Sequence, residues 1–88
     1  MTLEELKEIL GENTLSYSKV SLAELANIMP IVEVSLEMDK HSLDYYYQID
    51  VNELLESKMT KEEVEMLKEQ GWSFNDDKTK IILFLKNN

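Results

Sequence analysis

Apart from carboxylates, this 88-residue chain has few side chains that could bind a metal or transfer protons. Its one histidine, His41, lies between Asp39 and Asp44 in a polar stretch, and there is no cysteine. Imidazole and carboxylates are common metal ligands, but their spacing here matches no known pattern. Residues 75–79 have the acidic character of a calcium loop but lack its glycine and distal glutamate. We therefore interpret both stretches as turns and expect no metal site and no cofactor.

Sequence motifs for catalysis are also missing. The chain contains two glycines, and neither belongs to a G-x-S-x-G motif or to a glycine-rich phosphate loop. The lack of cysteine excludes thiol catalysis. Paired carboxylates can act as acid and base, but 18 acidic residues in 88 bring some carboxylates together by chance. We therefore expect no catalytic residues and no enzymatic activity.

The acidic residues are unevenly distributed along the chain. The net charge is −9, and residues 1–57 carry all of it, with 12 acidic residues against three lysines. Such an excess of negative charge attracts basic partners. The chain has no arginine, the side chain best suited to bidentate contacts with phosphate and guanine. We expect a basic protein surface as partner and no direct binding to nucleic acid.

Three features predict a cytoplasmic location without membrane association. The N-terminal residues have neither the basic stretch nor the apolar run of a signal peptide. The longest apolar run, Ile81–Leu85, is far shorter than the roughly 20 residues that a membrane helix needs. The absence of cysteine is also typical of a reducing compartment.

Three segments carry the S/T-x-x-E signature, in which a hydroxyl and a glutamate bind each other's backbone N–H groups at a helix start. The pairs are Thr2 and Glu5, Ser21 and Glu24, and Thr60 and Glu63. Apolar residues at helical spacing follow each pair, and Gly11, Pro30 and Gly71 mark the three ends. A further helical turn is expected over residues 50–57.

Between the helices, apolar and polar residues alternate with the period of a β-strand. Ile31–Met38 and Tyr45–Val51 are expected to form a hairpin in which Met38 lies opposite Tyr45. This register is strongly specified, because a slip of one residue would bury acidic side chains. The residues expected to face inward are Val32, Val34, Leu36, Met38, Tyr45, Tyr47, Ile49 and Val51.

The C-terminal part predicts a second hairpin, with strands at Trp72–Asn75 and Lys80–Leu85 and with Phe74 opposite Ile81. Residues 12–20 fit either a short strand or a loop. Runs of antiparallel strands with separate helices indicate the α+β class. We expect one acidic domain over residues 1–88, with an antiparallel sheet of four or five strands, built from two hairpins, and about three helices packed on one face.

The outward face of the first hairpin is the sharpest candidate for a binding site. The expected register places Glu33 opposite Asp50 and Glu37 opposite Tyr46. Like charges opposite each other destabilise a strand pair, by up to about 1 kcal/mol. Because the sequence tolerates this cost, we favour the interpretation that the hairpin presents an acidic surface to a basic partner. Two alternatives remain open: an ordinary solvent-exposed face that Lys19 relieves, and a capping role for Asp50 in the following turn.

Ile82 and Phe84 form a second candidate, because they alternate with the inward residues of the last strand. If they are exposed, they mark an interface between copies of the chain. If the strand is central and covered on both faces, they belong to the core. The sequence leaves both interpretations open.

Residues Val20–Met29 resemble the first helix of a helix-turn-helix. The basic recognition helix that should follow is replaced by Pro30 and an acidic strand, so we do not assign the chain to that family. A small transcriptional regulator ranks third among the functions, because the negative charge counts against it. A homo-oligomeric assembly module that uses the C-terminal hairpin ranks second. The leading hypothesis is a non-enzymatic protein-interaction domain, such as a phage- or mobile-element-type inhibitor whose carboxylates mimic nucleic acid.

Overall fold

The computed structural model describes residues 1–13, 17–18 and 26–85, and its framework is a sheet of five described strands. The strands are β1 (Tyr17–Ser18), β2 (Ser35–Met38), β3 (Tyr45–Asp50), β4 (Ser73–Phe74) and β5 (Lys80–Leu85). Their order is β1-β5-β3-β2, and β4 also pairs with β5. The pairs among β2, β3, β4 and β5 are antiparallel, whereas β1 runs parallel to β5. The predicted two hairpins and α+β class are confirmed.

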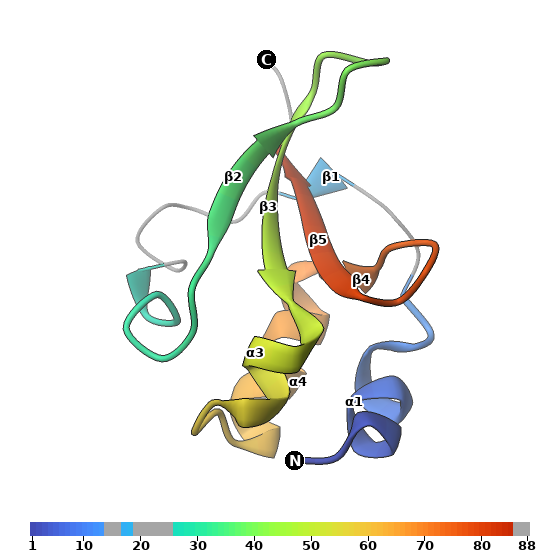
Figure 1. The fold of residues 1–88 in the computed structure, drawn as a ribbon. Coiled ribbons are helices and arrows are strands. Elements are labelled where there is room, and N and C mark those ends of the chain that lie inside the picture. Colours follow the sequence, from blue (N-terminus) through green and yellow to red (C-terminus); the bar gives the residue numbers. More distant parts are fainter. Residues whose placement is uncertain (14–16, 19–25, 86–88) are drawn as a thin grey trace.

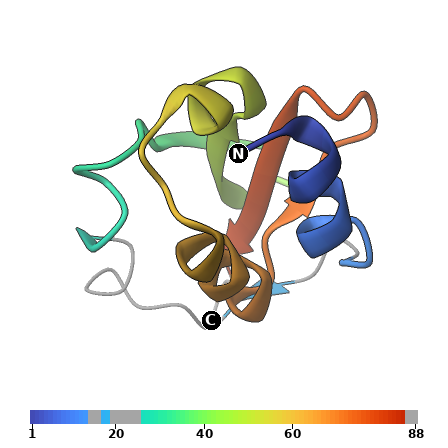
Figure 2. The ribbon, with the colours of Figure 1, turned by 90° about the horizontal axis from the view of Figure 1, so that it is seen from below.

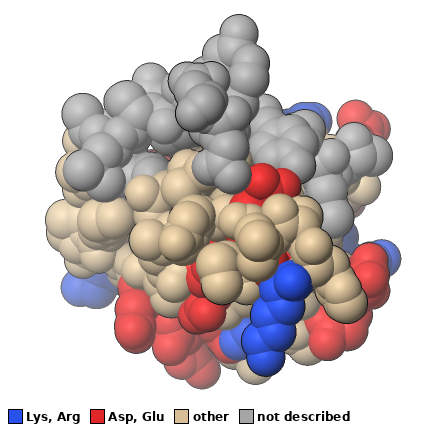
Figure 3. Space-filling model, turned by 90° about the horizontal axis from the view of Figure 1, so that it is seen from above, with Lys and Arg blue, Asp and Glu red and all other residues tan. Residues whose placement is uncertain are grey.

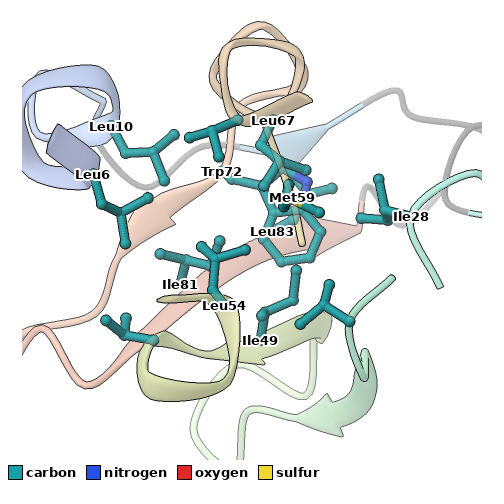
Figure 4. Close-up of a cluster of buried hydrophobic side chains, with 13 residues drawn as sticks. Leu6, Leu10, Ile28, Ile49, Leu54, Met59, Leu67, Trp72, Ile81 and Leu83 are labelled. Carbon is teal, nitrogen blue, oxygen red and sulfur yellow. The ribbon is translucent and has the colours of Figure 1, made fainter. Parts of the chain in front are cut away.

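Three described helices, α1 (Leu3–Leu10), α3 (Val51–Glu56) and α4 (Lys61–Gln70), lie on one side of this sheet. Figure 2 looks at the sheet through these helices. Their side chains and those of β3 and β5 enclose the core, in which Trp72 is fully buried (Figure 4). The core residues are Leu6, Leu10, Ile28, Val32, Ile49, Val51, Leu54, Met59, Val64, Leu67, Trp72, Ile81 and Leu83.

The helix starts follow from local hydrogen bonds. Both α1 and α4 begin with the predicted capping box, in which the threonine hydroxyl accepts from the glutamate N–H at 3.2 Å. α4 ends at Gly71, whose φ of 101° is the left-handed conformation that favours glycine. α3 corresponds to the turn expected over 50–57. The predicted helix start at Ser21 lies outside the described residues.

The register of the first hairpin is confirmed, but its first strand is shorter than expected. Met38 lies opposite Tyr45, and the ladder ends at the pair of Ser35 with Gln48. The prediction that the strand begins at Ile31 is wrong, because residues 28–32 form a turn instead. The carbonyl of Ile28 accepts from the N–H of residue 31 at 3.0 Å and from that of residue 32 at 3.1 Å.

The expected burial of this hairpin is also wrong in part. Leu36, Met38 and Tyr45 lie on the face predicted to be inward, yet 55%, 46% and 46% of their surface is exposed. The reason is visible in Figure 1, where the β2–β3 hairpin extends beyond the helices that cover the rest of the sheet. Ile49, near the end of β3, is buried as predicted, and so is Val51, although Val51 is the first residue of α3 and not part of the strand.

Candidate functional site

The sheet face opposite the helices carries the residues that the sequence singled out. The ladder pairs Glu37 with Tyr46, Tyr46 with Phe84, and Asp50 with Lys80, so these side chains share one face. Glu33 precedes β2 and has no partner in the ladder. The prediction that Glu33 lies directly opposite Asp50 is therefore wrong, because β2 begins two residues after Glu33.

A hollow of about 150 Å³ nevertheless brings Glu33 and Asp50 to one site. We call it the acidic hollow, and its lining residues are Glu33, Ser35, Gln48, Asp50, Glu53 and Lys80. Glu37 and Tyr46 share the face but do not line the hollow. The sequence analysis missed Glu53 and Lys80. Glu53 could have been found from its position three residues after Asp50, whereas Lys80 depends on the pairing of β3 with β5.

Asp50 has a structural role in the acidic hollow. Its Oδ1 accepts from the N–H of Asn52 at 2.9 Å and from that of Glu53 at 3.4 Å, which caps α3. Its Oδ2 accepts from Lys80 Nζ at 2.5 Å. The hydrogen bond from Lys80, followed by those from the backbone, lowers the pKa of Asp50, and the same bond raises the pKa of Lys80. The capping alternative is thus confirmed, and the expected pair of like charges, Glu33 opposite Asp50, is not part of the ladder.

The remaining carboxylates of the hollow are Glu33 and Glu53, which are both exposed, and Glu53 also interacts by charge with Lys80. The lysine that lines the hollow is already bound to Asp50. Among the described side chains, no group of three or more His, Cys, Asp or Glu residues is arranged to hold a metal ion. Exposed carboxylates without such an arrangement can attract a cationic group by charge.

Tyr46 and Phe84 pack against each other on the same face. Their ring centroids are 5.3 Å apart, at an interplanar angle of 50°, and both residues are partly buried. Ile82, with 8% of its surface exposed, is buried. β5 has β3 on one edge and β4 and β1 on the other. β5 is therefore a central strand and Ile82 is not exposed, but the core cluster includes neither Ile82 nor Phe84, so their role as an interface stays a prediction.

The loops around His41 and Asp77 are turns, as expected. Asp39 Oδ1 accepts from the N–H of His41 at 2.9 Å, and this bond is the main reason that the pKa of Asp39 is lowered. Asp77 Oδ1 accepts from the N–H and the hydroxyl of Thr79 at 3.0 and 2.6 Å. Both carboxylates thus stabilise their own loops.

No protein-family model, curated protein or solved structure matches this chain. In the described part of the chain, no helix is long and apolar enough to cross a membrane. The helix-turn-helix resemblance falls mostly on residues 20–25, which lie outside the described residues. The functional argument therefore rests on the charge and geometry of the residues themselves.

Proposed function

We propose that this protein is a non-enzymatic interaction domain that binds a basic site on another macromolecule. The binding surface comprises Glu33, Glu37, Tyr46 and Glu53, and the predicted residue Asp50 lies within it as a structural group whose charge Lys80 balances. The observation that carries the proposal is the pair of exposed carboxylates, Glu33 and Glu53, on a hollow whose lysine is already bound to Asp50. The net charge of −9 adds a long-range attraction for cationic partners.

A basic site that fits this surface is one that binds nucleic acid. Carboxylates can stand in for phosphates, because Lys and Arg side chains form charge-assisted hydrogen bonds with both. The protein would then act as an inhibitor that occupies the groove of a nucleic-acid-binding protein. The alternative, self-assembly through Ile82 and Phe84, is weakened because Ile82 is buried.

The test is affinity capture from a lysate of the native host with the wild type and a Glu33→Lys/Glu53→Lys variant. These two side chains are exposed, and neither contributes a carboxylate to the cap of α3. We expect the wild type to retain a basic protein at about 50 mM salt and to lose most of it at about 500 mM, because salt screens exposed charges. The variant should lose the partner, and duplex DNA should release it from the wild type.

The matched control is Glu65→Lys/Glu69→Lys, which makes the same change in net charge at exposed positions of α4. It should retain the partner. Equal loss of the partner in both variants would mean that net charge alone attracts it, and capture that resists salt and both variants would contradict the proposal.

A further inference from the structure

Among the described strands, β2 forms one edge of the sheet. β2 ends the strand order, and no described strand lies beyond it. The N–H of Asp39 donates to the carbonyl of Asp44 at 2.8 Å, so Asp39 and Asp44 are a hydrogen-bonded pair of the hairpin. Since hydrogen-bonded pairs alternate in antiparallel ladders, Glu37 pairs with Tyr46 through the backbone, and Leu36 and Met38 direct their N–H and C=O groups away from β3.

One face beside this edge is apolar and uncovered. Leu36, Met38 and Tyr45 are about half exposed, on the side of the sheet that the helices cover elsewhere. Leu43, in the adjoining loop, is 62% exposed. In Figure 3, which views the molecule from above, uncharged side chains occupy the centre of the described surface, and acidic side chains lie along its lower margin with lysine side chains among them.

The opposite face beside the same edge is acidic. Glu37 projects there from β2, and Glu33 lies just before the strand, both exposed. Successive side chains of a strand point to opposite faces, so a strand added to β2 would meet an apolar surface on one side and carboxylates on the other.

We propose that the outer edge of β2 binds an extended segment of the basic partner in which apolar residues alternate with Lys or Arg. The backbone of the segment would bond to Leu36 and Met38, its apolar side chains would cover the open apolar face, and its cations would face Glu37 and Glu33. This inference rests on the proposed function, because it assigns the strand edge to the same partner.

A second copy of this chain is a poorer occupant of the edge. Each copy carries a net charge of −9, and pairing β2 with β2 would bring the acidic side chains of two hairpins together. Like charges across a strand pair destabilise it. A basic segment removes this repulsion and meets both faces at once.

The test uses synthetic peptides of about eight residues, a length that spans an edge strand. One peptide alternates Val with Lys, and its control alternates Ser with Lys, so the two have equal charge. Binding is followed by calorimetry and by amide hydrogen exchange. We expect the Val/Lys peptide to bind at least about tenfold more tightly, a difference of about 1.4 kcal/mol. It should slow the exchange of the Leu36 and Met38 amides.

Two variants test whether the peptide binds the edge of β2 or any exposed apolar residue. Leu36→Pro removes an N–H that points away from β3 and should weaken the Val/Lys peptide about tenfold. Met66→Ser changes an exposed apolar residue on α4 and should leave binding unchanged. Circular dichroism checks that Leu36→Pro is folded, and exchange in the wild type provides a readout that does not depend on this variant.

The outcomes distinguish this inference from the proposed function. Equal affinity for the two peptides, no binding of the Val/Lys peptide, or no protection of Leu36 and Met38 would overturn the strand-addition proposal. Any of these results leaves the salt-dependent capture of a basic partner standing. If the Glu33→Lys/Glu53→Lys variant captures the partner as well as the wild type does, while the peptide still protects Leu36 and Met38, the acidic-surface proposal is overturned instead.

Discussion

At the scale of single residues, Asp50 shows how a side chain that resembles a binding group can be used internally. Its two carboxylate oxygens serve α3 and Lys80, so its charge is balanced within the fold. Glu33 and Glu53, which lie on the same hollow, keep their carboxylates exposed. The chemistry that a partner would meet therefore belongs to these glutamates.

Asp50→Ala should destabilise the protein by about 1 kcal/mol, which is typical for loss of an N-cap. The variant loses the acceptor for two backbone N–H groups at the start of α3. Urea unfolding measures the change in the free energy of unfolding. Asp76→Ala, at an exposed position in the last hairpin turn, is the control and should shift it by less than about 0.5 kcal/mol. Equal effects of the two changes would contradict the capping role.

At the scale of the elements, α1 and α4 are joined at both ends by polar contacts. Glu5, in the first turn of α1, forms a salt bridge with Lys61, with 2.8 Å between Oε2 and Nζ. Asn13, which follows α1, donates from Nδ2 to the carbonyls of Lys68 and Trp72 at 3.0 and 2.7 Å. These contacts hold the two helices side by side over the core.

The Glu5 contacts predict a loss of stability in acid. The hydrogen bond from Lys61, followed by those from Thr2, lowers the pKa of Glu5 from 4.5 to about 2. A lowered folded-state pKa stabilises the fold above the unfolded-state value, and this stability is lost as the pH falls from 4.5 through about 2. Glu5→Gln should therefore show a smaller drop in Tm between these pH values than the wild type.

Thermal unfolding at several pH values measures this difference. Glu4→Gln is the control, because Glu4 lies in the same first turn, is exposed, and the change removes the same charge. If the profile of Glu5→Gln matches that of the wild type, Glu5 is not the titrating group.

Asn13→Ala tests the other end of the helix pair. The change removes both donors from two carbonyls at the end of α4, and a lost hydrogen bond of a partly buried group costs about 1–3 kcal/mol. We expect urea unfolding to show a decrease in that range. Asn27→Ala, at an exposed position, should have little effect on the free energy of unfolding. A similar decrease in both variants would argue against a stabilising contact between Asn13 and the end of α4.

At the scale of the whole molecule, the helices cover one end of the sheet and leave the β2–β3 hairpin extending beyond them (Figure 1). This placement creates the open apolar face at Leu36, Met38 and Tyr45. The acidic hollow and the edge of β2 are adjacent, since Ser35 belongs to both. One partner could therefore engage charge, backbone and apolar surface together.

The sequence by itself determined the features that depend on neighbouring residues. The capping boxes at Thr2 and Thr60 and the register of Met38 with Tyr45 arise from hydroxyl–glutamate spacing and from alternation within one hairpin. Only the tertiary structure decided what lies beside Asp50 and what covers Leu36. Lys80 is 30 residues from Asp50, and burial depends on where the helices pack, so neither follows from a local pattern.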